Sequence, residues 1–413
     1  ISACLVGSEM CIRDSYNPVR HPERTRLRRN TVFEQMEKQG MLTAAQADSL
    51  KQLPLELDFH RVDHKDGLAP YFREELRRIL SAKKPVLSDY RGWEHQRYVD
   101  DSIAWEENPL FGWIEKNPKP DGTKYDIYSD GLKIYTTIDS RMQQYAEDAV
   151  KQHMSALQKA FFREKRGSRN APYTSNAQEL GNVKVENLIN HAIKQTERYR
   201  VLKAAGASDE EIRTSFNTPR EMNVFSYDGV VDTVMTPRDS LLWQKHFLRT
   251  GFMSMDPRNG HVKAYVGGPN FTFFQYDMAS TGRRQIGSTI KPFLYTYAME
   301  EGFTPCDMLS NTQPVFTDES GRPWAPRNSG SARVGEMVDL RWALTNSNNW
   351  ISARLMAQLS PTTLVRNMHN FGITNHIDPV MSLCLGSCEV SIKEMVGAYT
   401  AYANTVSYTH LTL

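Results

Sequence analysis

The sequence contains no run of about 18 or more apolar residues, so no segment predicts a membrane-spanning helix. Its net charge is only +2, which gives no support to a general nucleic-acid-binding role. The eleven histidines form no metal-binding pattern such as H-E-x-x-H. With 24% charged and 40% apolar residues, the 413-residue chain instead has the composition of a globular protein with two or three domains.

Cysteines are also scarce, and only Cys384 and Cys388 among the five lie close together. One C-x3-C pair without a second pair or a nearby histidine is not a typical zinc site, so we expect neither a metal nor a cofactor. Two small buried thiols are the favoured interpretation. A disulfide between them is the alternative if the compartment is oxidising.

The two ends of the chain look foreign to the rest. Residues 1–15 (ISACLVGSEMCIRDS) and 406–413 (VSYTHLTL) show neither a hydrophobic period nor helix caps. Glu9, Arg13 and Asp14 interrupt the first stretch, which has no basic leader, so it does not resemble a signal peptide. We expect both ends to be non-native, adapter-derived sequence, and the natural protein to be longer at each end.

The first half of the chain predicts helices and loops. Short helices are expected over 16–53, where Thr43 and Gln46 form a capping-box pattern. An amphipathic helix is expected to begin near Pro70. The scattered aromatics, prolines and glycines of residues 84–125 indicate a loop-rich segment.

Alternation predicts a strand from Leu132 to Ile138, and Asp139 or Ser140 would cap a long helix that ends near Phe162. Residues 164–240 are polar with weaker periodicity, which indicates an inserted, partly helical region. The expected inner face of the long helix consists of Met142, Tyr145, Ala149, Met154 and Leu157.

From Gly251 onward the pattern changes to a hairpin with its turn at PRNG, followed by a helix from Ser288 to Gly302. Two further helical pieces are expected to be broken at Asn346–Asn349, whose side chains compete for backbone hydrogen bonds. Strands followed by a cluster of helices predict an α+β domain, with helices packed on an antiparallel sheet.

The segment RRQIGSTIKPF places Ser288 and Lys291 one helical turn apart. Pro292 is tolerated only in a first turn, so Ser288 would lie at a helix start among free N–H groups. Gly287 would let backbone approach closely beside the serine. A lone S-x-x-K is weak evidence, and the alternative is that Ser288 is a simple helix cap.

The triplet Ser347-Asn348-Asn349 strengthens the interpretation as a nucleophilic site. A serine needs a base to take its proton, and a desolvated lysine can be that base. Ser347 could relay the proton to the leaving group, while Asn349 could hold Lys291 in line and bind a peptide-like substrate. Backbone N–H groups at the helix start would stabilise the oxyanion, at about 3 kcal/mol per donor.

These residues resemble a known family. RRQIGSTIKPF and TNSNN resemble the first two signature motifs of serine penicillin-binding transpeptidases. MDPRNGHVKAYVGG, WAPRN and LGSCEVSIKEMVGAYTAYAN resemble the same domain, and within WAPRN the resemblance makes Trp324 and Asn328 candidate substrate-binding residues, with a plain loop as the alternative. The third motif of the family, K-[ST]-G, is absent, and we expect it to lie beyond the end of this sequence.

The segment YNPVRHPERTRLRRN resembles the last stretch of the peptidoglycan glycosyltransferase domain of class A penicillin-binding proteins. Arg24, Arg28 and Arg29 would then be a remnant of its diphosphate-lipid groove, with a simple solvated helix face as the alternative. The catalytic glutamates of that domain would lie upstream of residue 16. GLAPYFREELR and GLKIYTTID resemble the connecting region of the same class.

The chain would then have five parts, of which the resemblance implies the three inner ones. Residues 1–15 and 406–413 are the foreign ends; 16–60 are the last helices of a glycosyltransferase domain, 61–245 a linker and inserted region, and 246–405 a truncated transpeptidase domain of the penicillin-binding/β-lactamase-like fold.

The intact protein would polymerise a lipid-linked precursor and cross-link peptidoglycan stem peptides through a Ser288 acyl-enzyme, which β-lactams would also acylate. It would lie on the outer, periplasmic face of the cytoplasmic membrane, held by an N-terminal anchor that this sequence lacks, and the fragment itself would be nearly inactive. The alternatives are a D,D-carboxypeptidase or β-lactamase-type hydrolase, and a non-catalytic penicillin-binding scaffold.

Overall fold

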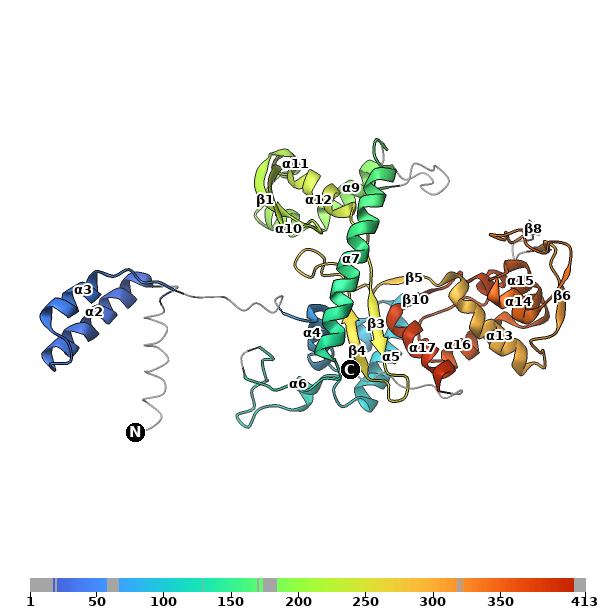
Figure 1. Ribbon diagram of the computed structural model, residues 1–413, viewed down its shortest axis with the longest axis horizontal. Coiled ribbons are helices and arrows are strands. Elements are labelled where there is room, and N and C mark those ends of the chain that lie inside the picture. The colour runs from blue at the N-terminus through green and yellow to red at the C-terminus, as the bar shows by residue number, and fades with distance from the viewer. Residues whose placement is uncertain are drawn as a thin grey trace. The chain divides into compact units, whose positions relative to one another are not determined.

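The computed structural model divides the chain into two compact units, Ile1–Asp66 and Gly67–Leu413 (Figure 1). The two stretches expected to be non-native lie outside the described residues. Within the described part, no helix combines the length and the apolar character needed to cross a lipid bilayer. The structure describes residues 18, 21–57, 67–128, 130–168, 171–173, 184–317, 321 and 323–404.

The first unit contains a pair of helices, α2 (Pro22–Lys38) and α3 (Ala44–Gln52), which pack against each other. Thr43 caps α3 and forms the expected capping box with Gln46. The prediction of short helices over 16–53 is confirmed for the described residues.

The second unit begins with α4 (Pro70–Leu80), the predicted amphipathic helix. The expectation of a loop-rich segment over 84–125 is only partly right, because it also contains α5 (His95–Glu107). Contacts with the residues before it help to hold α5: the Tyr90 hydroxyl donates to Asp101 at 2.8 Å, and the Tyr90 and Tyr98 rings lie 5.4 Å apart. Contacts of this kind leave little periodic signal in the sequence. The remaining short turns are η1 (Leu87–Asp89), η2 (Gly92–Glu94) and α6 (Trp113–Lys116).

The strand predicted from Leu132 to Ile138 is wrong, since the segment belongs to none of the ladders among the described residues. Its end is nevertheless tied to the hairpin strand β4 (Val262–Val266), because the Thr137 hydroxyl donates to the carbonyl of Val262 at 2.8 Å. Asp139 then caps α7 (Ser140–Glu164), as predicted, by accepting backbone N–H bonds of the first turn.

The buried face of α7 differs from the prediction. Of the five residues expected inside, Met154 is buried, whereas Met142, Tyr145, Ala149 and Leu157 are exposed. Gln143 is buried instead and acts like a short piece of strand: it accepts the N–H of Tyr265 at 2.7 Å and donates to the carbonyl of Tyr265 at 2.9 Å. A rule that counts apolar residues cannot find a face that packs through paired amides.

Farther along α7, Gln158 repeats this arrangement by donating to the carbonyl of His246 and accepting the N–H of Leu248, both at 2.9 Å. Beside this part of the helix lies a small region of helices and one antiparallel hairpin, which confirms the expected partly helical character. Its elements are α9 (Val185–Lys194), α10 (Glu197–Ala204), α11 (Asp209–Asn217), β1 (Arg220–Val224), β2 (Val231–Met235) and α12 (Pro237–Lys245).

The predicted hairpin is formed by β3 (Phe252–Met255) and β4. Ala264 and Val266 pack toward α7, while Tyr265 belongs to a cluster with Phe72 of α4 and Ile392 of α17 (Ile392–Ala403). Helices therefore cover the hairpin on both faces.

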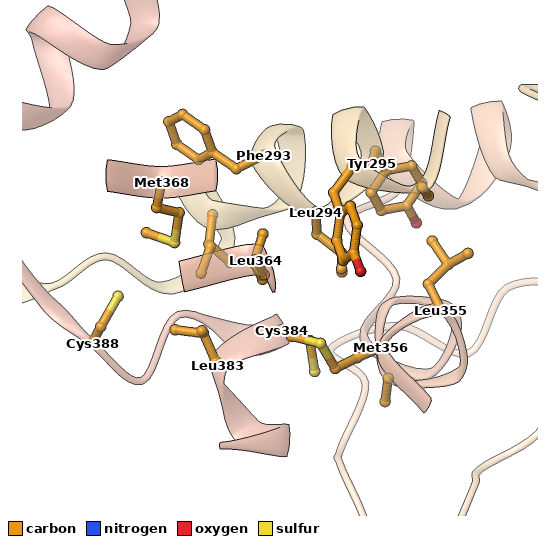
Figure 2. Packing of buried hydrophobic residues seen from close by; sticks show 14 of the residues in the cluster. Phe293, Leu294, Tyr295, Leu355, Met356, Leu364, Met368, Leu383, Cys384 and Cys388 are labelled. Atoms are coloured by element: carbon orange, nitrogen blue, oxygen red, sulfur yellow. The ribbon is translucent and has the colours of Figure 1, made fainter. Parts of the chain in front are cut away.

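The rest of the unit is a helical cluster with short ladders. Its core is centred on α13 and contains the side chains in Figure 2, such as Leu294, Met356 and Leu364, all essentially inaccessible. The helical elements are η3 (Gly287–Ile290), α13 (Lys291–Glu300), α14 (Leu340–Thr345), α15 (Asn349–Gln358), α16 (Pro361–Asn370) and η4 (Met381–Leu385). The strands are β5 (Arg283–Gln285), β6 (Met308–Ser310), β7 (Phe316–Thr317), β8 (Pro323–Trp324), β9 (Met337–Asp339) and β10 (Glu389–Ser391).

The fold is thus a mixed arrangement of helices and antiparallel strands. The described strands form five two-stranded ladders: β1–β2, β3–β4, β5–β10, β6–β9 and β7–β8. The one continuous antiparallel sheet that the sequence predicts is not seen among the described residues. The predicted break between the two helical pieces at Asn346–Asn349 is confirmed, because α14 ends at Thr345 and α15 begins at Asn349.

Candidate active site

Ser288 lies at the start of the helix that carries Lys291, close to the predicted position. The helix does not begin as an α-helix, however: the 3-10 turn η3 comes first, and α13 starts at Lys291. Such tight turns are common at helix N-termini. Pro292 occupies the first turn of α13, as expected. The Ser288 side chain is exposed and makes no hydrogen bond to the described residues.

Lys291 is the most unusual residue of the site, because its side chain is charged and yet only 1% exposed. Its amine donates three hydrogen bonds: to the Ser347 carbonyl at 2.6 Å, to the Ser347 hydroxyl at 3.1 Å, and to Asn349 Oδ1 at 2.7 Å. Burial lowers the pKa of Lys291 to about 8, against a smaller opposing effect of the nearby Cys384 thiol. The amine can therefore lose its proton near neutral pH.

The loop before α15 supplies the acceptors for this amine. Ser347 has a φ of 50°, a left-handed conformation that is uncommon for serine. Asn348 is buried and caps α15 by accepting the N–H of Ile351 at 3.0 Å, and its amide donates to Asn311 at 2.8 Å. The S-x-N triplet thus brings two residues to Lys291 and anchors the helix with the third.

Asn349 is held from the other side by the loop that contains Asn328. Its backbone N–H donates to Asn328 Oδ1 at 2.7 Å, and its side-chain amide donates to the Arg327 carbonyl at 2.7 Å. Trp324 is half-buried and packs on Phe316, with ring centroids 5.9 Å apart. The structure therefore joins Lys291, Ser347, Asn349 and Asn328 in one network, and places Trp324 in a neighbouring ladder.

Sequence reasoning missed the segment that holds the turn with Ser288. The N–H of Gly287 donates to the Gly386 carbonyl and that of Ile286 to the Cys388 carbonyl, both at 3.2 Å. A Cβ on Gly386 would overlap the backbone of Gly287, whereas a Cβ on Gly287 would meet open space. The close backbone approach predicted beside Ser288 is therefore present, between Gly287 and Gly386, but Gly386 is the residue that must lack a Cβ. Gly287 is needed instead for its φ of 53°.

A further contact holds the other side of this turn. The Tyr399 hydroxyl of α17 donates to the carbonyl of Thr289 at 2.8 Å. The only sequence signal for these partners is the LGSC turn and the helix after it, which carry no recognisable chemistry by themselves.

The two neighbouring cysteines, Cys384 and Cys388, are buried free thiols, as the favoured interpretation predicted. Burial raises the pKa of Cys384 to about 12 and that of Cys388 to about 11. Neither thiol is therefore a thiolate at neutral pH, and their contribution is to the core.

The arginines of the expected lipid-groove remnant lie on α2 in the first unit. Arg24 and Arg28 are exposed. Arg29 has a structural role, because its guanidinium donates hydrogen bonds to carbonyl groups at the end of α3. The helix dipole favours a positive charge at this end of a helix. These carbonyls belong to Lys51, Leu53 and Pro54.

Comparison with known proteins shows to which family the chain is related. Residues 168–248 match the penicillin-binding protein middle domain, and residues 250–412 match the penicillin-binding protein transpeptidase domain. The chain is therefore related to the class A penicillin-binding proteins, and it contains a transpeptidase domain of that family.

Individual relatives agree. The chain is 24% identical to penicillin-binding protein 2D of Bacillus subtilis and covers 38% of it. It is 26% identical to penicillin-binding protein 1A of Escherichia coli and covers 44% of it. Both matches include 94% of the chain, which thus spans less than half the length of these relatives. The crystal structure of penicillin-binding protein 1A from Haemophilus influenzae has a similar fold, with a TM-score of 0.52 at 17% identity over 94% of this chain and 54% of that one.

Proposed function

We propose that the site is that of a peptidoglycan D,D-transpeptidase with Ser288 as its nucleophile. The observation that carries this proposal is the buried Lys291 amine, which lies within bonding distance of Ser347 and Asn349 and is one helical turn from the exposed Ser288. The family match of residues 250–412 supports the same reaction class.

The three hydrogen bonds that the Lys291 amine donates correspond to its protonated form, since each of the three ammonium hydrogens has an acceptor. When the amine loses one proton, a lone pair becomes available. It accepts the proton of the Ser288 hydroxyl while the serine oxygen bonds to the carbonyl carbon of the penultimate D-alanine. Backbone N–H groups of the Gly287–Ile290 turn stabilise the negative charge that forms on the carbonyl oxygen.

The tetrahedral intermediate then collapses, and its C–N bond to the terminal D-alanine breaks. Ser347 relays a proton to the departing nitrogen, so that neutral amine leaves and an ester on Ser288 remains. An amine of a second stem peptide attacks this ester, forms the cross-link and returns the proton through the same groups. A β-lactam acylates Ser288 by the same first step, but its leaving nitrogen stays attached to the adduct.

Labelling with a fluorescent penicillin tests this assignment. The complete protein should be labelled, and its Ser288→Ala variant should not. Equal labelling of the two proteins would falsify the role of Ser288. Labelling of neither would favour the non-catalytic scaffold.

Hydrolysis is the second candidate reaction, because the same acyl-enzyme can react with water. Product analysis with a D-alanyl-D-alanine peptide and an amine acceptor separates the two. A cross-linked product supports transpeptidation, whereas hydrolysed peptide alone indicates a carboxypeptidase or β-lactamase-type enzyme.

The intact protein would also be a glycosyltransferase that polymerises a lipid-linked precursor on the periplasmic face of the membrane. In this proposal residues 16–60 end that domain and 246–405 hold most of the transpeptidase domain. The isolated chain should turn over substrate far more slowly than the complete protein. Comparable rates for the two would contradict this expectation.

A further inference from the structure

We propose that Asn328 is a positioning residue, which together with the Arg327 carbonyl fixes the Asn349 side chain so that its oxygen faces the Lys291 amine. This inference rests on the proposed function, because it concerns the same amine. It assigns to Asn328 a role other than substrate binding.

The orientation of the Asn349 amide follows from its two partners. The carbonyl of Arg327 can only accept, so the side-chain atom of Asn349 that lies 2.7 Å from it must be the NH2 group. The atom 2.7 Å from the Lys291 amine must then be the oxygen. If the Asn349 amide were rotated by half a turn, its NH2 group would face the Lys291 amine and its oxygen would face the Arg327 carbonyl. Donor would then meet donor, and acceptor would meet acceptor.

Asn328 fixes the backbone to which this amide is attached. Asn349 is the first residue of α15, where backbone N–H groups have no partner inside the helix. Asn328 Oδ1 accepts that N–H at 2.7 Å, from outside the helix. Both the backbone and the side chain of Asn349 are thus bonded to two adjacent residues of one loop.

The loop itself is anchored on both sides of Asn328. The Pro326 carbonyl accepts from the Gln313 amide and from the Trp350 indole, each at 3.0 Å. Farther along, the buried Asn311 donates to the carbonyls of Ala332 and Arg333 at 3.0 and 2.8 Å. Asn328 therefore projects from a fixed support, which a positioning residue needs.

The groups around the Lys291 amine make its titration a sensitive report on this arrangement. From the loop before α15 it faces Ser347 and Asn349, which are uncharged. The buried Cys384 thiol of η4 also faces the amine and raises its pKa, against the larger effect of burial. No carboxylate among the described residues contributes to the pKa of Lys291, so the groups that accept hydrogen bonds from its ammonium form are the neutral oxygens of Ser347 and Asn349.

The test measures the protonation of Lys291 directly in the isolated chain. The chain is labelled with 13C and 15N in lysine, and the side-chain signals are followed by NMR against pH. The signal of Lys291 is identified by its loss in Lys291→Met. The variants are Asn328→Ala, Asn328→Asp and, as a matched control, Gln313→Ala, which removes a hydrogen bond from the same loop without touching Asn349.

In Asn328→Ala the freed Asn349 should turn away from Lys291, so that the ammonium form loses an acceptor. The titration midpoint should fall by about half a pH unit or more. Gln313→Ala should leave the midpoint unchanged. Asn328→Asp keeps an acceptor oxygen at the same place and adds a negative charge, so its midpoint should lie at or above that of the unmodified chain.

Equal midpoints in Asn328→Ala and Gln313→Ala would overturn the proposal. If Asn328→Ala does not fold, a midpoint below normal in Asn328→Asp would overturn it, and one at or above normal would support it. Because the titration requires no acylation, it is independent of penicillin labelling at Ser288. Failure of the positioning role can therefore be told apart from failure of the transpeptidase assignment.

Discussion

Replacing Gly386 with alanine tests how the turn that carries Ser288 is held in place. Gly386 has a φ of 75°, and its backbone lies directly against that of Gly287, which has a φ of 53°. The two glycines therefore share an unusual backbone conformation but differ in their surroundings. Gly287→Ala is the matched control, because a Cβ there would meet no atom within 4 Å.

The expected losses follow from this difference. An alanine at either position is forced into the left-handed region, which costs about 1 kcal/mol. At Gly386 the new Cβ also overlaps the carbonyl oxygen and nitrogen of Gly287, so one of the two backbones must move. Overpacking of this kind adds about 2 kcal/mol. Gly386→Ala should therefore lower the free energy of unfolding by about 3 kcal/mol, and Gly287→Ala by about 1 kcal/mol.

Urea unfolding gives the two free energies, and hydrogen–deuterium exchange of residues 283–291 locates the effect. Gly386→Ala should speed exchange in this segment much more than Gly287→Ala does, because the ladder between β5 and β10 and the bond from Gly287 to the Gly386 carbonyl lie at the point of overlap. Equal losses for the two variants would show that the close approach at Gly386 does not support the turn.

Three further predictions concern buried polar groups. Since the pKa of Lys291 is lowered to about 8, acylation of Ser288 in the complete protein should rise about tenfold from pH 6 to 7 and level off above about pH 9; a flat rate over this range would exclude Lys291 as the base. Burial opposes ionisation of Glu75, but its bonds with Arg78 and Lys393 outweigh that effect and lower its pKa from 4.5 to about 2. Its folded pKa lies below the unfolded one, so the stabilisation of about 3 kcal/mol is complete above pH 4.5 and disappears as the pH falls toward 2; in urea unfolding, a pH-independent difference from Glu75→Gln would contradict this. Gln143→Leu should lower the free energy of unfolding by about 3 kcal/mol, because it leaves the backbone N–H and carbonyl of Tyr265 without their hydrogen-bond partner. Gln144→Leu on the exposed face of α7 should lower it much less. Similar losses for the two variants would refute the buried pairing.

The sequence predicts the helices well wherever a cap or a proline marks the boundary. Thr43, Asp139 and Pro292 each lie where the pattern places them. The residues around the Lys291 amine are also recoverable, because Ser347 and Asn349 belong to a short triplet on a helix break. These features are local, and local chemistry is what a single sequence records.

The failures have the opposite character. Gln143 is buried because its amide pairs with the backbone of Tyr265, which is 122 residues farther along the chain. Gly386 is required because the backbone of Gly287 lies against it. Asn328 is marked by the sequence only as a candidate for substrate binding, with no sign of its bond to the backbone N–H of Asn349. In all three cases the partner is a backbone group distant in the chain, which leaves no mark on periodicity or spacing.

Ser347 shows why such a site departs from local rules. Glycine would adopt its φ of 50° at little cost, whereas a serine there loses about 1 kcal/mol. Only a residue with a side-chain oxygen, however, can offer both its carbonyl and a hydroxyl to the same amine, at 2.6 and 3.1 Å. A buried ammonium without such acceptors would be far more costly than the backbone strain. The strained residue and the buried lysine therefore depend on each other. Backbone strain at this point is expected if, as proposed above, the amine is shielded from water and still exchanges a proton.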